Sequence, residues 1–385
     1  MFASRTNWNR EKNPLAVALD EARAAGKKII DLSASNPTHC GFSFDSGAIL
    51  RALADPAALE YDPDPRGLLS ARRAVVDYYA AHGDVLSPDD LLLTASTSEA
   101  YSFLFRALCD PGAEILVPAP SYPLFDFLVA IQDVHVVRYP LLHDHGWQID
   151  FHALERCLTP QSRAIVVVHP NNPTGHFTKP GEIEQLNSFA TARSLALIAD
   201  EVFWDFHLGS QPPASFAANR EALTFTLSGI SKICGLPQMK AAWIVAQGPA
   251  HLKAEAIERL EIIADTYLSV GAPVQHALPQ FLSLRGAFQR QLMDRVRHNL
   301  AALDRSLKNS PGVTRLEMEG GWYAVLRVPV TRTDEHLAIA LLRETGVYLH
   351  PGHFYDFAGE GNLVVSLIPR EEEFTEGIRA LLSLV

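Results

Sequence analysis

The chain has 385 residues, of which 48% are hydrophobic and 20% are charged, a balance typical of a globular protein with one large core or two domains. Its formal net charge is −11, which excludes the basic surface that nonspecific nucleic-acid binding requires. The opening residues, MFASRTNWNREKNPLA, lack the apolar core of a signal peptide. No stretch reaches the roughly 18 consecutive apolar residues expected of a membrane helix.

Cysteine usage bears on the cellular compartment. The four cysteines are Cys40, Cys109, Cys157 and Cys234, and no two of them have the spacing of a CxxC motif. A disulfide framework and a structural zinc site are therefore not expected, whereas a reducing compartment is. We expect a cytoplasmic protein that binds no metal.

Short apolar segments alternate with helical patterns between about residues 89 and 246. Seven of them have the composition of buried strands; they are 91–96, 114–119, 134–140, 163–170, 195–202, 223–229 and 241–246. Strands that are apolar on both faces and separated by helices predict a mostly parallel sheet that is covered on both sides. Ligands bind such sheets where loops leave the carboxyl ends of the strands, so functional residues should lie there.

The remainder of the chain has a different pattern. Residues 250–310 carry apolar positions at helical spacing. After them, the segments 320–330, 347–352 and 362–368 resemble strands, and 334–346 resembles a helix. This order predicts a second, smaller part of α+β type.

A turn-forming segment follows one of the predicted strands. VVVHPNNPTGHF leaves a buried strand and continues into residues that favour a turn. A turn alone would explain this composition. The side-chain amide of Asn172 could equally donate a hydrogen bond to a ligand oxygen.

Another strand ends in two carboxylates. LALIADEVFWDF places Asp200 and Glu201 after five apolar residues, so Asp200 should lie at the buried edge of a site. A buried carboxylate needs a cationic or hydrogen-bonding partner. A helix cap or a structural ion pair is the alternative.

The segment LLLTASTSEAYSF combines a strand, a turn rich in Ser and Thr, and a helix. Backbone N–H groups at the N-terminus of a helix bind anions. Ser96, Thr97 and Ser98 are also preferred N-cap residues, and taken alone the segment is explained by a plain cap.

The segment LSGISKICGLPQ places Lys232 just past an apolar strand, among Ser, Gly and Ile. Lysine side chains usually lie on solvated surfaces, so an ordinary surface lysine and a functional lysine are both open at this point. A lysine in a partly desolvated site would lose its proton more readily than one in water.

In combination these segments resemble the class I/II aminotransferase family, which consists of fold-type I pyridoxal-phosphate enzymes. HPNNPTG, ADEVF and SGISKICGLP occur in the family's order, and the resemblance extends from YDPDPRGLLSARRAV to the C-terminal helix. It implies an α/β fold with a mostly parallel seven-stranded sheet in a large domain and a smaller α+β domain. Residues 46–280 would form the large cofactor-binding domain and 281–385 the small domain. Residues 1–45 would contribute to the small domain and cover the active site.

The resemblance also implies a role for each matching residue. Lys232 would form the internal aldimine with the aldehyde of pyridoxal 5′-phosphate and then move the substrate Cα proton as acid and base. Asp200 would keep the pyridinium nitrogen protonated, and Asn172 would hydrogen-bond the ring 3′-oxygen. The other implied cofactor contacts are Tyr122 on the ring face, Ser96, Thr97, Ser231 and Lys240 at the phosphate, and Tyr61, reaching the phosphate from the neighbouring subunit of a homodimer.

The chain departs from the family at four positions. Ser96 stands where glycine is frequent, and Phe203 stands where a tyrosine usually donates to the 3′-oxygen. Lys240 replaces an arginine that grips the phosphate, which keeps the charge but loses the bidentate fork. The most serious departure is Val364, which aligns with the arginine that binds the substrate α-carboxylate.

Other residues could bind that carboxylate. Arg5 and Arg370 are the two candidate arginines, and for each an ordinary surface position is the alternative. Asn36, His353 and Tyr355 lie in segments that the resemblance places at the substrate pocket. For His353 and Tyr355 the alternative is simple loop packing.

We therefore predict a pyridoxal-phosphate-dependent aminotransferase that moves an amino group from an α-amino acid to a 2-oxo acid. Because Val364 replaces the usual arginine, a lyase, decarboxylase or oxidase with the same cofactor is the closest alternative. A non-catalytic sensor on this fold would carry a DNA-binding module, which does not fit here, and a Rossmann dehydrogenase would need an early GxGxxG. The predicted partners are small amino and oxo acids and a second copy of the chain, with no nucleic acid and no membrane.

Overall fold

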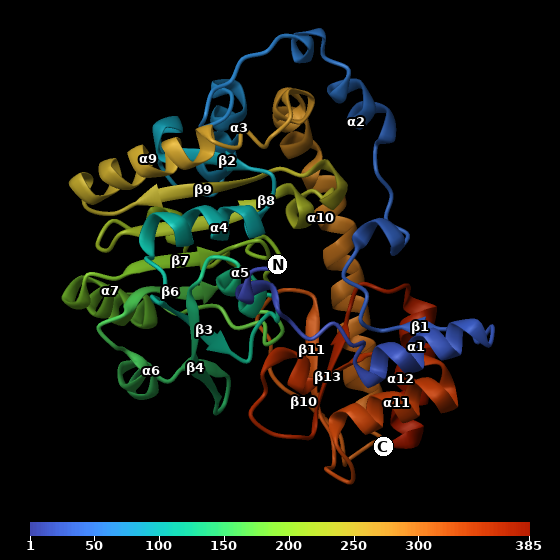
Figure 1. Ribbon diagram of the computed structural model, residues 1–385. Helices are drawn as coiled ribbons and strands as arrows, with labels where there is room; N and C mark the ends of the chain where they lie inside the picture. Colours follow the sequence, from blue (N-terminus) through green and yellow to red (C-terminus); the bar gives the residue numbers. More distant parts are fainter.

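The larger part of the protein is built around one mixed sheet, seen at the left of Figure 1. The computed structural model describes all 385 residues. The strands lie side by side in the order β2 (Leu91–Thr94), β9 (Ala242–Gln247), β8 (Thr224–Gly229), β7 (Ala196–Asp200), β6 (Ser162–Val168), β3 (Glu114–Ala119), β4 (His135–His143) and β5 (Trp147–Ile149). Most of their residues are buried aliphatic ones, as suits strands that are covered on both faces.

The strand directions confirm the mostly parallel sheet expected from the sequence. β8, β7, β6, β3 and β4 pair in parallel, and β9 is antiparallel to both of its neighbours, β2 and β8. All seven predicted strands are present, and β5 adds an eighth by forming an antiparallel hairpin with the end of β4. Because β2 runs in the same direction as β8, the carboxyl ends of all strands except β9 and β5 lie at one edge.

Helices cover both faces of the sheet. One face packs against α4 (Thr97–Leu108), α5 (Phe125–Ala130) and α9 (Ala250–Asp265), and the other against α3 (Leu69–Ala80), α6 (Phe151–Cys157), α7 (Pro180–Arg193) and α10 (Ala272–Leu307). Successive residues of a strand point to opposite faces. Thus Ile198 packs on the α4 side, whereas its neighbour Leu197 packs on the α7 side.

The smaller part lies at the lower right of Figure 1 and contains its own antiparallel sheet. Its strands follow the order β10 (Thr314–Arg315), β11 (Tyr323–Arg327), β14 (Asn362–Ser366) and β13 (His350–Pro351). The helices α11 (Asp334–Thr345) and α12 (Glu371–Leu384) pack beside it. The N-terminal segment joins this part, because β1 (Ile30–Asp31) pairs with β12 (Val347–Tyr348) and α1 (Pro14–Ala24) packs on α11.

The long helix α10 connects the two parts. It packs against α3 and against α2 (Ser46–Leu53), and further along it packs against α12. The predicted domain boundary between residues 280 and 281 falls within this continuous helix, and the division into 1–45, 46–280 and 281–385 stays a prediction. None of the helices combines the length and apolar character needed to cross a bilayer.

Candidate active site

Three of the predicted site residues lie at or just after the ends of neighbouring strands, whose carboxyl ends meet at one edge of the sheet. Asp200 ends β7, which pairs in parallel with β6 through Val168 and with β8 through Leu227. Asn172 follows β6, and Lys232 follows β8. Their loops therefore leave the sheet side by side, at the place where parallel sheets bind ligands.

Lys232 lies in a short helix, α8 (Ile230–Ile233), directly after β8. Its Nζ lies 5.5 Å from the ring centroid of Phe203 and 5.1 Å from that of Trp322. Burial lowers the pKa of Lys232 to about 8, while the charge of Asp200 acts in the opposite direction. A fraction of the amine is therefore unprotonated near neutral pH, as a nucleophile requires.

The backbone makes a close contact at Gly229, three residues before Lys232. Gly229 ends β8 and directly precedes α8. A Cβ at this position would lie 2.8 Å from the Cβ of Ala242 and 2.9 Å from the carbonyl oxygen of Ala241. Glycine therefore allows β8 and β9 to stay close together up to the start of α8.

Asp200 is held by two hydrogen bonds. Its Oδ2 accepts from the hydroxyl of Tyr101 at 3.0 Å, and its Oδ1 accepts from the backbone N–H of Val202 at 3.2 Å. Burial raises the pKa of Asp200 to about 6, while these bonds and the charge of Lys232 act in the opposite direction. At pH 7 the carboxylate is still mostly ionised, and its hydrogen-bond partners are a hydroxyl and an amide rather than a cation.

The adjacent carboxylate, Glu201, has a structural environment. Its oxygens accept hydrogen bonds from the hydroxyl of Ser215 and from the N–H of Phe216, both at 2.7 Å. Burial raises the pKa of Glu201 to about 8. Glu201 therefore anchors the chain near residue 215, whereas Asp200 is directed toward Tyr101 and the site.

Tyr101 was not predicted as a site residue. It lies in α4, is fully buried, and reaches Asp200 from the face opposite Lys232's helix. The only signal in the sequence is general, since a buried tyrosine hydroxyl usually has a hydrogen-bond partner. Its contact with Asp200 depends on how α4 packs against β7, which is not visible in local sequence.

Asn172 is buried, with 8% of its surface exposed, and its Oδ1 has no hydrogen-bond partner. The turn around it is closed internally. The carbonyl of Asn171 accepts from the N–H of Gly175 at 2.7 Å, and the N–H of Asn171 donates to the carbonyl of His176 at 2.8 Å. A buried amide without a partner is costly, which favours a ligand at this position.

The N-terminus of α4 combines a cap with free donors. Ser96 is the N-cap, and its hydroxyl accepts from the N–H of Glu99 at 3.2 Å, as the capping interpretation predicts. The N–H groups of Thr97 and Ser98 belong to the first turn and have no acceptor within the helix. This end of the twelve-residue helix is therefore suited to an anion such as a phosphate.

The other cofactor candidates are more accessible. Ser231 is half-buried beside Lys232, whereas Lys240 is exposed just before β9. Tyr122 follows β3 and is about half-exposed. Tyr61 is 84% exposed and precedes α3.

The two candidate arginines have different surroundings. Arg5 forms an ion pair with Asp133, and both side chains are substantially exposed. Arg370 directly precedes α12, and its guanidinium lies beside Gly41, where a Cβ would come within 2.9 Å of Nε. The guanidinium of Arg5 is therefore occupied, whereas that of Arg370 is next to backbone.

The remaining substrate candidates also differ in how far they are engaged. Asn36 accepts hydrogen bonds from the N–H and the hydroxyl of Thr38, at 3.1 and 2.7 Å. His353 is exposed. Tyr355 is buried, and its hydroxyl lies 3.0 Å from Nδ1 of His350.

Val364 lies where the resemblance expects an arginine. It is 1% exposed on β14, opposite Val325 of β11 and His350 of β13. Burial lowers the pKa of His350, so this imidazole is neutral at pH 7. This part of the sheet face therefore carries no permanent positive charge.

The residues present fit pyridoxal phosphate. Lys232 offers a partly unprotonated amine, and Asp200 offers a carboxylate without a cationic partner. Asn172 offers a buried amide without a partner, and the N-terminus of α4 offers free N–H donors. Each group of the cofactor that needs a partner could therefore find one at this edge of the sheet.

The comparisons with known proteins identify the family of the chain. The family model described as aminotransferase class I and II matches residues 27–381. Glutamate-pyruvate aminotransferase AlaA of Haemophilus influenzae is 27% identical over 92% of this chain and 90% of its own length. S-alkyl-thiohydroximate lyase SUR1 of Arabidopsis thaliana is also 27% identical, over 79% and 68%. An alanine aminotransferase structure from Pyrococcus furiosus has a TM-score of 0.91 at 23% identity and covers 100% of this chain and 99% of its own.

The chain belongs to the class I and II aminotransferase family. It has the fold-type I architecture that the solved structures share, and it is an aminotransferase. The family is dependent on pyridoxal phosphate. The predictions of fold, family and enzyme class made from the sequence are therefore confirmed.

We predict that Lys232 in the cofactor-free protein reacts with an amine-modifying reagent with a pH midpoint near 8, because burial disfavours its protonated form. In Asp200→Asn the midpoint should fall further, since the negative charge that favours the protonated amine is removed. Mass spectrometry of the modified peptide over a pH series measures both values. A midpoint near the ordinary 10.5, or a rise in Asp200→Asn, would contradict the description of the site.

Proposed function

We propose that this aminotransferase uses pyridoxal 5′-phosphate and that Lys232 is its catalytic residue. The observation that carries the proposal is that three groups meet at one edge of the sheet. They are a partly buried lysine of lowered pKa, an aspartate without a cation, and an asparagine whose Oδ1 has no partner. The proposed substrates are an α-amino acid and a 2-oxo acid. Glutamate, pyruvate and alanine are the first to test, because a relative of similar length is named for glutamate and pyruvate.

The roles of the residues follow from their surroundings. When bound, pyridoxal phosphate supplies an aldehyde that takes up the amino group and a ring that accepts electrons. Lys232 would hold the cofactor and later carry the Cα proton of the substrate as base and acid. Asp200, oriented by Tyr101, would keep a proton on the ring nitrogen. Asn172 would donate to the ring oxygen.

The phosphate would bind at the N-terminus of α4. Ser96 and Thr97 would bind it through the free N–H groups and hydroxyls of this end, and Ser231 would add a hydroxyl beside Lys232. Lys240 would contribute charge from the loop before β9. Tyr122 would stack on the ring from the end of β3.

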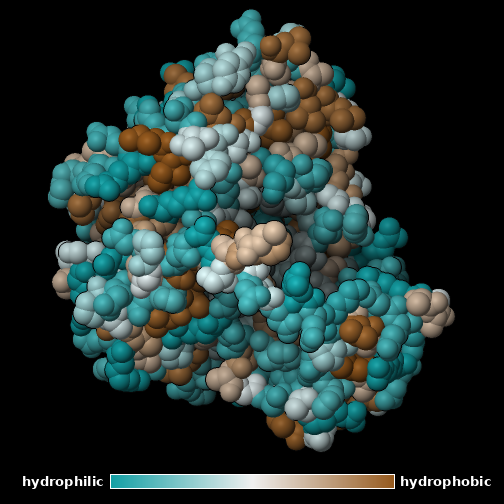
Figure 2. Space-filling model, viewed as in Figure 1, coloured by the Kyte–Doolittle hydropathy of each residue, from teal (hydrophilic) through white to brown (hydrophobic).

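A homodimer would complete the site. The segment between α2 and α3 arches away from the body of the molecule in Figure 1, and it carries Leu59 and Tyr61, which are 91% and 84% exposed. Hydrophobic residues also gather at the upper right of Figure 2, over α2 and the neighbouring end of α10, and Leu50 of α2 is among the exposed ones. Apolar residues exposed together favour an interface. We propose that a second copy covers them and receives Tyr61 in its phosphate site.

Arg370 is our preferred partner for the substrate carboxylate. Its guanidinium forms no ion pair with a carboxylate of the protein, whereas that of Arg5 is engaged with Asp133. Asn36, His353 and Tyr355 are proposed as secondary contacts of the substrate. The four cysteines are all unpaired, which supports a cytoplasmic location.

We predict that Lys232→Ala abolishes amino transfer, and that Asp200→Ala keeps bound cofactor but lowers kcat roughly hundredfold, because the electron-accepting ring loses its charge partner. The measurement is amino transfer from alanine or glutamate to a 2-oxo acid, together with the visible absorbance of the bound cofactor. Turnover by Lys232→Ala would remove the proposed function. A near-normal rate in Asp200→Ala would remove the role of Asp200.

A lyase, decarboxylase or oxidase is the second candidate, favoured by the uncharged surroundings of Val364 and by the similarity to a lyase. The same assay without a 2-oxo acid separates the two functions. An aminotransferase should stop after one amino group per site. Continued release of ammonia, carbon dioxide or peroxide would favour the second candidate.

We predict that Arg370→Ala raises KM for the amino acid roughly 10- to 100-fold, the effect of losing a hydrogen bond to a charged group, with a smaller change in kcat. Arg5→Ala is the matched control and should leave KM within about threefold of the wild type, because Arg5 is paired at the surface. Half-reactions followed by absorbance give both constants. Equal behaviour of the two variants would show that neither arginine binds the carboxylate.

We predict that subunits with complementary defects restore activity when they are combined. A hybrid dimer of Tyr61→Ala and Lys232→Ala chains would contain one site with both wild-type residues, because Tyr61 acts on the neighbouring subunit. Its activity should reach about half that of the wild-type dimer, well above either parent. A hybrid no more active than the Tyr61→Ala homodimer would place Tyr61 in its own subunit's site.

A further inference from the structure

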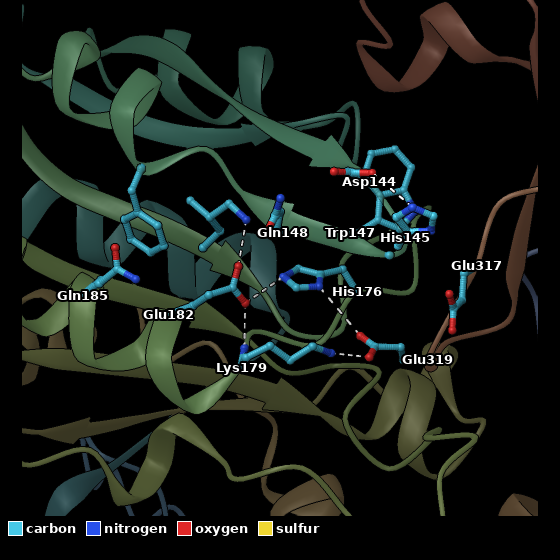
Figure 3. Close-up of a pocket in the computed structure, with 13 residues that line it drawn as sticks. Asp144, His145, Trp147, Gln148, His176, Lys179, Glu182, Gln185, Glu317 and Glu319 are labelled. Atoms are coloured by element: carbon cyan, nitrogen blue, oxygen red, sulfur yellow. Dashed lines mark hydrogen bonds and ion pairs between the residues drawn. The ribbon is translucent and has the colours of Figure 1, made fainter.

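A pocket of about 310 Å³ lies against the loop that carries Asn172, where it is lined by His176 and Lys179 (Figure 3). It is lined by charged side chains from three places: the turn between β4 and β5, the start of α7, and the segment that leads into β11. In Figure 3 the imidazole of His176 lies between two carboxylates, those of Glu182 and Glu319. The amino group of Lys179 is directed toward Glu319.

Four ionisable side chains in this pocket are linked by ion pairs. Nε2 of His176 is 3.2 Å from Oε2 of Glu182, and its Nδ1 is 3.7 Å from Oε2 of Glu319. Lys179 forms an ion pair with the other oxygen of Glu319. Glu182 also accepts from the N–H of Lys179 and from that of Ile149, both at 2.7 Å. With His176 protonated, two positive and two negative charges balance.

The surroundings favour that protonated form. Burial alone would lower the pKa of His176, but the carboxylates of Glu182 and Glu319 raise it above its ordinary value. Burial would raise the pKa of Glu319, but its contacts with His176 and Lys179 and the N–H of Phe177 lower it to about 2. The pKa of Glu182 is lowered as well, mainly by His176 acting against burial.

We call residues 318–321 the strap, because they hold two loops of the large sheet together. The carbonyl of Gly175 accepts from the N–H groups of Glu319 and Gly320, both at 3.1 Å. On the other side, the carbonyl of Glu319 accepts from the N–H of Leu208 at 2.8 Å, and the carbonyl of Phe206 accepts from the N–H of Gly321 at 2.8 Å. The next residue along the chain is Trp322, which lies beside the amine of Lys232.

The Asn172 loop depends on the strap for several of its contacts. Oε2 of Glu319 accepts from the N–H of Phe177 at 3.1 Å, in addition to contacting His176. Gly175 has a φ of +72°, and a Cβ there would lie 2.7 Å from the carbonyl oxygen of Gly320. The strap therefore touches the loop through backbone and side chain, within a few residues of Asn172.

We propose that Glu319 is a positioning residue for Asn172: with His176 and Lys179 it clamps the loop so that the Asn172 amide faces the cofactor ring. The proposal rests on the role given to Asn172 above. A neighbouring residue that does not contact the Asn172 loop should not position Asn172, and such a residue can serve as a control. Glu317 is such a residue, because it lines the same pocket two positions away but forms no ion pair or hydrogen bond with the loop.

The clamp can be tested by NMR of the histidine side chains in the full chain, with His176→Gln used to assign the signal. In the wild type we expect His176 to titrate above 6.5, and in Glu319→Gln at a lower pH than in the wild type, because one of its two carboxylates is neutral. The other charged groups around it are Glu182 and Lys179, with Asp144 and His145 from the turn between β4 and β5. Glu317→Gln should leave the value nearly unchanged.

The link to Asn172 needs a second readout, the pH at which the visible absorbance of the bound cofactor changes. Asn172→Ala should raise this midpoint, because the ring oxygen loses a hydrogen-bond donor. Glu319→Gln should raise it by about half a unit or more, with Glu317→Gln as the matched control. Glu319→Asp keeps the charge on a shorter side chain and should fall between Glu319→Gln and the wild type, and it replaces Glu319→Gln if that variant fails to fold.

The outcomes separate the inference from the proposed function. A midpoint that Asn172→Ala leaves unchanged would overturn the role of Asn172, and the positioning role of Glu319 with it. A midpoint that responds to Asn172→Ala but not to Glu319→Gln would overturn the positioning role alone. A His176 signal that is indifferent to Glu319→Gln would show that the charged clamp does not exist.

Discussion

Lys232 and Asp200 are brought to the same edge of the sheet, and both are partly buried there without forming an ion pair with each other. The parallel pairing of β7 with β8 fixes this placement, since it puts the carboxyl ends of the two strands side by side. Burial moves both groups toward their neutral forms, the pKa of Lys232 down to about 8 and that of Asp200 up to about 6. Two ionisable groups thus lie in a partly desolvated region, and their charges are not neutralised by an ion pair between them.

Removing two ionisable groups from water costs free energy, and the contacts around them offset only part of this cost. Tyr101 and the N–H of Val202 satisfy Asp200 by hydrogen bonds, and the rings of Phe203 and Trp322 surround the amine of Lys232. Such a site is more stable once a ligand brings a positive charge to the aspartate and consumes the free amine. Perturbed pKa values of neighbouring groups such as these are typical of catalytic sites.

Much of the fold could be predicted from the sequence, because the strands are short, strongly apolar and separated by turn residues. All seven expected strands of the large sheet are present. The short β5 was missed, since Trp147–Ile149 has three residues and no pattern of its own. The helical segment expected at 250–310 is present as two helices, α9 (Ala250–Asp265) and α10, and α10 continues unbroken from Ala272 through Pro279 to Leu307. Its extent is set by packing against distant helices rather than by local composition.

The site divides in the same way. The placement of Lys232, Asp200 and Asn172 at one edge of the sheet could be predicted, because each lies at the end of a strand or a few residues after it, where chain order determines position. Tyr101 could not, since its contact depends on the packing of a helix across the sheet. Glu319 could not either, because it lies more than a hundred residues from the loop that it contacts. A contact between residues so far apart in the chain produces no pattern in the sequence around either of them.

The replacement at Val364 also has a physical consequence beyond specificity. An arginine on the buried face of β14 would place a permanent charge between Val325 and His350, and such a charge needs a partner whenever no substrate is bound. With valine the small sheet packs as an ordinary apolar layer. Under the proposed function, a negative group of the substrate would instead be recognised at the rim, where the exposed Arg370 stays solvated.

The strap joins the two sides of the site in one short segment. Glu319 contacts the loop of Asn172, and three residues later Trp322 lies beside the amine of Lys232. The strap continues directly into β11 of the small sheet, which pairs with β14 through Val325 and Val364. A shift of the small sheet would therefore move both contacts together. Glu319 makes its contact through a charged carboxylate, whereas Trp322 makes its contact through the face of its ring.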